Sequence, residues 1–281
     1  IDSIRENFPK RFINVGIAEQ NLINIATGLA LEGYKVFAYA IAPFITMRCL
    51  EQIRVNLGLL STIRNMNINL IGVGAGYSYV VSGPTHQCYE DISLVRTIPN
   101  IEIFSPCDSI TTSLFPEYAI KNTFPKYFRL DAQVLPSVYN NEKPNLVSGY
   151  NVLVSGKDVC LISTGYMTQT AISICDMLKK DNINATIIDI YSLTTFDEDS
   201  LRKLIEPFEV IATLEEGFVG VAGVDAIISN LIRNSLNELL CFGVQRNYTF
   251  EIGSREYIHE KIGIGKSYIY NSIKSSLNRK R

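Results

Sequence analysis

The first half of the chain alternates short runs of apolar, often β-branched residues with segments whose apolar residues recur at helical spacing. A short extended segment is predicted over residues 12–15, and buried strands over residues 35–42, 69–73, 101–104 and 127–130. Helices are predicted over residues 18–31, 47–60, 91–96 and 109–121. This alternation is typical of a mainly parallel sheet covered by helices on both faces.

A second series of the same kind follows. It predicts strands over residues 159–163, 186–190, 210–214 and 241–244, and helices over residues 167–180, 197–205 and 223–236. Between the two series, residues 134–155 are rich in Pro, Asn, Tyr and Gly and lack helical periodicity. We therefore expect two open α/β domains, over residues 1–136 and 156–281, joined by a linker over residues 137–155.

The composition is that of a folded chain with large apolar cores, since 47% of the 281 residues are hydrophobic and 19% are charged. The formal net charge is -2, and the basic residues are scattered except over residues 274–281, which we expect to be a solvated tail. No apolar run could span a membrane, and no signal peptide is evident. We expect neither a nucleic-acid nor a membrane partner, and we expect native residues to precede Ile1.

The six cysteines lie far apart, without a Cys-x-x-Cys pair, and the only histidines are His86 and His259. A zinc site or a disulfide framework is therefore not expected, and no metal ligands are predicted on this chain. A reducing cytoplasm fits this use of cysteine.

The stretch most suggestive of chemistry is Asn-Val-Gly-Ile-Ala-Glu-Gln-Asn at residues 14–21, where an extended segment ends, a glycine permits a tight turn and a helix begins. Ligands of open parallel sheets bind at such strand-to-helix connections. Glu19 lies in the first helical turn. Taken alone, it could equally serve only to complement the helix dipole.

The sequence around Glu19 resembles that of the transketolase and deoxyxylulose-phosphate synthase family. Gly-Ile-Ala-Glu-Gln at residues 16–20 is similar to the family motif around the glutamate that contacts the aminopyrimidine ring of thiamin diphosphate. Gly-Pro-Thr-His-Gln at residues 83–87, Ile-Pro-Asn at 98–100 and Pro-Cys-Asp at 106–108 follow in the family's order. Less specific similarities, such as Glu-Glu-Gly at residues 215–217, extend into the second half of the chain.

The resemblance implies roles for individual residues. Glu19 would be the catalytic, cofactor-contacting acid, and burial suits it because desolvation favours a carboxyl that shares a proton with a ring nitrogen. Phe44 would stack on the aminopyrimidine, and Ile41 stands where some members carry another aromatic residue. His86 would contact the reacting oxygens of the substrate, as a hydrogen-bond donor or proton shuttle.

The substrate side is where the chain departs from the family. Arg129 matches an arginine that binds the phosphate of the acceptor, although an arginine at a strand end can equally be a salt-bridge partner. Ser82 replaces an aspartate that many members carry before Gly-Pro-Thr-His, and the loop with Tyr77, expected to line the substrate site, lacks the usual histidine or arginine. We therefore expect an altered substrate: a modified or nucleotide-linked sugar, or a small 2-oxo acid.

The chain also lacks the Gly-Asp-Gly segment by which the family holds magnesium and the diphosphate of the cofactor. The resemblance then implies a partner subunit of the N-terminal type that carries this site. We expect a homodimer of β-like chains within an α2β2 heterotetramer, which transfers a two-carbon ketol or acyl unit in carbohydrate metabolism. Two alternatives stay open: the β subunit of a 2-oxo-acid dehydrogenase, and a non-catalytic scaffolding subunit.

Overall fold

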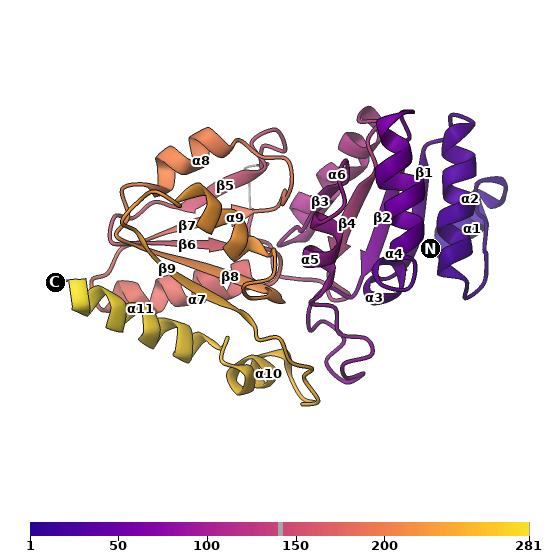
Figure 1. The fold of residues 1–281 in the computed structure, drawn as a ribbon. Coiled ribbons are helices and arrows are strands. Elements are labelled where there is room, and N and C mark those ends of the chain that lie inside the picture. The colour runs from indigo at the N-terminus through magenta and orange to yellow at the C-terminus, as the bar shows by residue number, and fades with distance from the viewer. Residues whose placement is uncertain (140–142, 281) are drawn as a thin grey trace.

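Each half of the chain builds its own sheet (Figure 1). The structure is a computed structural model that describes residues 1–139 and 143–280. Residues 140–142, within the predicted linker, and residue 281, the end of the basic stretch, lie outside the described residues.

The first sheet has four parallel strands in the order β1-β2-β4-β3. The strands are β1 (Val36–Ile41), β2 (Ile68–Val73), β3 (Glu102–Phe104) and β4 (Lys126–Leu130). All four were predicted, with boundaries that differ by one residue. Residues 12–15 differ from the prediction, since they pair with none of the described strands.

The helices of the first half are α1 (Asp2–Asn7), α2 (Glu19–Leu31), α3 (Ala42–Thr46), α4 (Leu50–Gln52), α5 (Asp91–Arg96) and α6 (Ser109–Lys121), with the 3-10 helices η1 (Pro9–Arg11) and η3 (Leu60–Thr62) and the π-helix η2 (Ile53–Leu59). The single helix predicted over residues 47–60 is therefore divided. The chain leaves helical geometry at Cys49, with φ -120° and ψ 27°, and the next turns widen into η2.

The second sheet has five strands in the order β5-β7-β6-β8-β9, namely β5 (Tyr150–Val154), β6 (Val159–Ser163), β7 (Ala185–Ile190), β8 (Val210–Phe218) and β9 (Glu238–Val244). Strand β5 lies on the edge and runs antiparallel to β7, while the other neighbours are parallel. The linker predicted over residues 137–155 was wrong on this point, because its last part forms β5. A short, half-buried edge strand gives only a weak apolar pattern.

The second half contributes α7 (Met167–Lys180), α8 (Glu198–Ile205), α9 (Val224–Leu231), α10 (Arg255–Ile262) and α11 (Lys266–Lys280). Residues 274–280 are not the solvated tail that we predicted. Within α11, Ile273 and Leu277 are buried in the core on one face of the second sheet, and the basic residues occupy the other side of the helix. No helix within the described ranges combines the length and the apolar character that a bilayer crossing requires.

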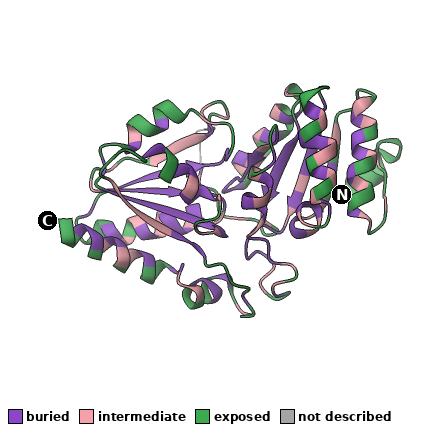
Figure 2. Ribbon diagram, in the orientation of Figure 1, coloured by how far each residue is buried: buried purple, intermediate pink, exposed green. Residues whose placement is uncertain are grey.

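The way the two sheets meet decides where a ligand can bind. Buried residues run from the first sheet into the second with little interruption (Figure 2). The backbone N–H of Ser105, after β3, donates to Tyr191 O after β7 at 2.8 Å, and Arg129 on β4 donates to Glu216 O on β8 at 2.8 Å. The first half therefore covers the carboxyl ends of β7 and β8, and the carboxyl ends of β1 and β2 stay accessible, with Tyr39 and Val81 exposed.

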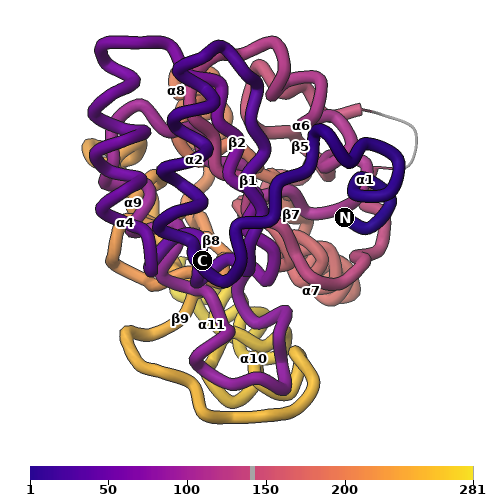
Figure 3. Tube along the Cα trace, turned by 90° about the vertical axis from the view of Figure 1, so that its right-hand side faces the viewer, coloured from indigo at the N-terminus to yellow at the C-terminus, as the bar shows by residue number. Residues whose placement is uncertain are grey.

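The long connection after β2 lies beside the loop that follows β9 (Figures 1 and 3). The hydroxyls of Tyr77 and Thr249, one from each loop, are 2.8 Å apart. The second domain therefore supports the loop that carries His86.

Candidate active site

Glu19 begins helix α2 at the carboxyl end of β1. Helix α2 leads directly into β1 and packs against it, so its first turn lies beside the end of that strand. Gly16 makes the preceding turn with φ +74°, a conformation that favours glycine. The side chain of Glu19 is buried, with 8% of the residue exposed. The expected burial of this acid is therefore met.

The partner of Glu19 is Arg48, which no motif in the sequence singled out. Arg48 Nη1 donates to Glu19 Oε2 at 2.6 Å, while 43% of the arginine side chain remains exposed. The guanidinium also lies over the ring of Phe44, with Cζ 4.3 Å from the ring centroid. The spacing of four residues between Phe44 and Arg48 is a signal that could have suggested this stacking.

Phe44 lies in α3, directly after β1, and Ile41 is the last residue of that strand. Both side chains are half-buried. Phe44 therefore presents a ring to a partly open space beside Glu19, as a stacking surface requires.

His86 lies in the turn over residues 82–88 and faces Phe44. The two ring centroids are 5.4 Å apart and nearly perpendicular. Thr85 Oγ1 lies 2.9 Å from His86 Nδ1, which holds the ring in place. The exposed Ser82 begins the same turn, and its carbonyl accepts the Thr85 hydroxyl at 3.4 Å. The structure thus brings Glu19, Phe44 and His86 into one cluster, although their chemical roles stay predictions.

Tyr79 completes the aromatic side of this cluster. Its ring centroid lies 6.3 Å from that of His86. Gly74 has φ +105°, and a Cβ there would come within 2.2 Å of the Tyr79 ring, so glycine permits this packing. Burial, together with Tyr39 and Asp131, raises the pKa of Tyr79, which therefore keeps its proton and can donate a hydrogen bond.

Tyr77 does not line this space, contrary to our prediction. It is fully buried, with its ring against Tyr89 and His259 and its hydroxyl against Thr249. Two positions further along the same connection, it is Tyr79 that lies beside His86. The loop was identified correctly, but the residue within it was not.

Arg129 also lies elsewhere than predicted. Only 2% of it is exposed, and its Nε donates to Asp91 Oδ2 at 2.8 Å. Its Nη2 donates to Cys88 O at 3.1 Å and to Glu216 O at 2.8 Å. A guanidinium committed to these groups is not presented to a substrate phosphate. The structural alternative, a buried salt-bridge partner, describes Arg129 correctly.

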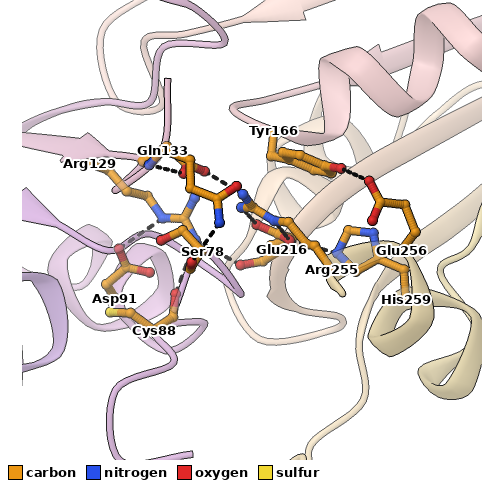
Figure 4. A network of polar contacts seen from close by, with 11 residues as sticks. Ser78, Cys88, Asp91, Arg129, Gln133, Tyr166, Glu216, Arg255, Glu256 and His259 are labelled. Carbon is orange, nitrogen blue, oxygen red and sulfur yellow. Dashed lines mark hydrogen bonds and ion pairs between the residues drawn. The ribbon is translucent and has the colours of Figure 1, made fainter. Parts of the chain in front are cut away.

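Arg129 belongs to a polar network that crosses between the two halves (Figure 4). On the second half, Glu216 accepts hydrogen bonds from both sides of the Arg255 guanidinium, and His259 Nε2 lies 2.6 Å from its Oε1. Burial favours the neutral acid, but Arg255 and the hydrogen bonds from Arg255 and His259 outweigh it and lower the pKa of Glu216 well below its usual range. Figure 4 shows this network turned inward, so we assign it to holding the domains together.

Glu215, next in the chain, is a buried carboxyl of a different kind. Its Oε1 accepts the backbone N–H of Asp225 at 3.1 Å, and its Oε2 has no hydrogen-bond partner among the described residues. Burial and the nearby Asp225 raise its pKa to about 7. This acid therefore titrates near neutrality, away from the Glu19 cluster.

The comparisons with known proteins agree with this geometry. Residues 2–137 match the family model described as transketolase, pyrimidine binding domain, and residues 149–269 match transketolase, C-terminal domain. One of the two subunits of an apulose-4-phosphate transketolase from Phocaeicola vulgatus is 33% identical over 230 residues, which is 80% of this chain and 72% of that protein. This chain belongs to the transketolase family.

Two further relatives cover almost all of this transketolase-family chain. A 6-deoxy-6-sulfo-D-fructose transketolase subunit of a Clostridium species is 26% identical over 98% of the chain and 84% of that protein. A solved structure described as a split gene transketolase, inactive β4 tetramer, is 29% identical, with a TM-score of 0.87 over 99% of the chain and 88% of that protein. The chain is thus a transketolase-type transferase subunit with the two-domain α/β fold predicted from its sequence.

The family implies thiamin diphosphate, and the cluster in this transketolase-family chain suits one part of that cofactor. A buried carboxyl, a half-exposed aromatic ring and a histidine lie side by side. A planar, basic heterocycle such as the aminopyrimidine needs a hydrogen-bonding acid at its edge and an apolar wall on its face. Glu19 and Phe44 offer these, so the residues present fit that ring.

Proposed function

We propose that this chain is the β-like subunit of a two-component, thiamin-diphosphate-dependent transketolase that moves a two-carbon ketol unit from a ketose donor to an aldehyde acceptor. The observation that carries the proposal is the convergence of Glu19, Phe44 and His86 at the accessible carboxyl ends of β1 and β2. The relatives named above are transketolases, which favours ketol transfer over the acyl transfer of a 2-oxo-acid dehydrogenase.

Each residue of the cluster has a proposed task. Thiamin diphosphate supplies, when bound, the carbon nucleophile that breaks and re-forms the carbon–carbon bond. Glu19 would hold a proton at the edge of the aminopyrimidine ring, and Phe44, with Ile41 beside it, would pack against the face of that ring. His86 would donate a hydrogen bond to the reacting oxygen of the sugar.

We further propose that a partner subunit holds the diphosphate and magnesium, within an α2β2 assembly. Support comes from the relatives, two of which are named as subunits of transketolases and one of which is a split-gene product. The linker over residues 137–155 and the domains on either side of it keep their predicted limits as proposals, apart from β5. We propose the cytoplasm as the compartment because the six cysteines are thiols without disulfide bonds.

The substrate that we propose is a modified sugar. Apulose-4-phosphate and 6-deoxy-6-sulfo-D-fructose appear in the names of the relatives. Ser82 is compatible with such a change because its short hydroxyl replaces the acidic group that many members place before the Gly-Pro-Thr-His turn. Because Arg129 is committed to Asp91, any anionic group of the substrate would be bound by other residues, from this chain or the partner.

The proposal is tested by turnover in the reconstituted pair. The chain is co-purified with its N-terminal-type partner, supplied with thiamin diphosphate and magnesium, and assayed with ketose donors and aldehyde acceptors. We expect ketol transfer that Glu19→Ala abolishes. Equal turnover by wild type and Glu19→Ala would support the scaffolding alternative, and acyl transfer from a 2-oxo acid would support the dehydrogenase alternative.

A further inference from the structure

Arg48 contacts both residues that we assign to the aminopyrimidine ring. We propose that the Arg48 guanidinium occupies the place of this ring in the cofactor-free chain and leaves when the ring binds. The inference rests on the proposed function, because it requires that Glu19 and Phe44 receive thiamin diphosphate.

The geometry of Arg48 is that of a substitute ligand. Its Nη1 donates to Glu19 Oε2 at 2.6 Å, and its Cζ lies 4.3 Å from the centroid of the Phe44 ring. A guanidinium is planar and carries N–H donors at its edge, so it can stack on an aromatic face and donate to a carboxylate together. An aminopyrimidine ring bound by Glu19 and Phe44 would use the same carboxyl oxygen and the same ring face.

Both groups cannot occupy this space, and their demands on Glu19 conflict. The ion pair with Arg48 requires an ionised carboxylate. The proposed catalytic task requires a carboxyl that shares a proton with a ring nitrogen. Arg48 must therefore move before Glu19 can act.

Arg48 is placed so that it can move. Its side chain is 43% exposed, and the hydrogen bond to Glu19 is the one its guanidinium makes within the described residues. It also directly precedes Cys49, where the helical geometry is interrupted. Release into water costs little for a charge that is already partly hydrated. In the absence of cofactor, the contact keeps the buried Glu19 carboxylate paired.

The nearby Arg54 provides a matched control. Arg54 also pairs with a glutamate, since its Nη2 lies 2.8 Å from Glu51 Oε1. Both side chains of that pair are exposed, at 60% and 65%, and their ion pair is with each other rather than with Glu19. Arg54→Gln therefore removes the same charge from the same segment without opening the proposed ring site.

The test is calorimetric binding of thiamin diphosphate, with magnesium, to the reconstituted pair that contains wild type, R48Q, R48K or R54Q. We expect R48Q to bind about tenfold more tightly than wild type, because the competing ion pair and cation–π contact are gone. R48K keeps the charge but not the plane, and should fall between the two. R54Q should match wild type.

The outcomes separate this inference from the proposed function. Equal or weaker cofactor binding by R48Q and R48K, with wild-type binding intact, overturns the inference and makes Arg48 a bystander or a direct cofactor ligand. Failure of every pair to bind the cofactor overturns the proposed function itself. Melting curves recorded for each variant show whether it is folded, and R48K serves the test if R48Q is not.

Discussion

The two histidines of the chain, His86 and His259, differ in their surroundings more than in their chemistry. His86 is half-buried in a turn, with Thr85 at one ring nitrogen and Phe44 at one side. His259 is 3% exposed, paired with Glu216 at 2.6 Å and enclosed by Tyr77 and Tyr166. One imidazole is presented to a space that a ligand can enter, and the other is a link between packed elements.

The arginines repeat this contrast. Arg129 is buried and donates to Asp91, Cys88 and Glu216, so its hydrogen-bonding capacity serves the fold. Arg48 is partly exposed and donates to Glu19. What separates a candidate functional residue from a structural one here is how far its polar atoms are already committed, and the following predictions test that distinction.

The largest effect is expected from Glu19→Gln. The amide is nearly the same size but cannot supply the acidic proton, so turnover of the reconstituted pair should fall by about 10² to 10⁴-fold. Steady-state kinetics with saturating cofactor measures this, and Glu51→Gln, on an exposed carboxylate, is the matched control. A loss smaller than about threefold would remove Glu19 from the catalytic machinery.

The next effect concerns stability. Arg129→Met leaves the buried Asp91 carboxylate without its guanidinium, which should lower the free energy of unfolding by about 3–5 kcal/mol. Arg48→Gln, which breaks a pair with one partly exposed member, should lower it by no more than about 1 kcal/mol. Urea unfolding of the isolated chain compares the two. Similar losses for both variants would abolish the contrast between the arginines.

Glu215 should make stability depend on pH. Burial and Asp225 raise its pKa to about 7 from 4.5, so below pH 4.5 the acid is neutral in both states and costs nothing. As the pH rises from there through about 7, the unfolded chain releases this proton first, and stability is lost by at most about 3 kcal/mol. Asp189, with a pKa raised to about 6 by burial, contributes in part of the same range.

Glu215→Gln isolates this contribution. Free energies of unfolding measured from about pH 5 to 8 should decline less in this variant than in wild type, because the amide does not ionise. Parallel curves for the two proteins would show that Glu215 does not titrate in this range. Asp225 and Arg96, charged groups close to Glu215, remain unchanged in this comparison.

The smallest effect should separate the two histidines. His86→Asn should lower kcat/KM by about 10- to 100-fold and leave the unfolding midpoint almost unchanged, because a hydrogen bond to the substrate is lost and no buried contact is. His259→Asn should lower the unfolding midpoint, since Glu216 loses one of its buried donors. The reverse pattern would exchange the roles assigned to the two residues.

The sequence predicted elements with strong local patterns best. Helices α5, α6 and α7 and strand β6 have the predicted limits, because their apolar periodicity and flanking turns are local signals. Helices α10 and α11 and strand β5 were missed. Their apolar stripes are interrupted by many polar residues, and they become structured through packing on the second sheet.

The site was predicted where a motif fixed the position, and missed where distant partners decide. Glu19, Phe44 and His86 lie together as the motifs implied. Tyr77 and Arg129 were misplaced because Thr249 and Glu216, which bury them, come from the other domain. Arg48 reaches Glu19 across 29 residues, and nothing local in the sequence indicates that contact.

We conclude above all that this chain carries only part of a cofactor site, and calorimetric titration of thiamin diphosphate with magnesium decides the matter. The titration is done with the chain alone and with the chain mixed with its N-terminal-type partner. We predict negligible binding to the chain alone and tight binding to the mixture. Tight binding to the chain alone would contradict a divided site, and no binding to the mixture would contradict the assignment of Glu19 and Phe44 to the cofactor.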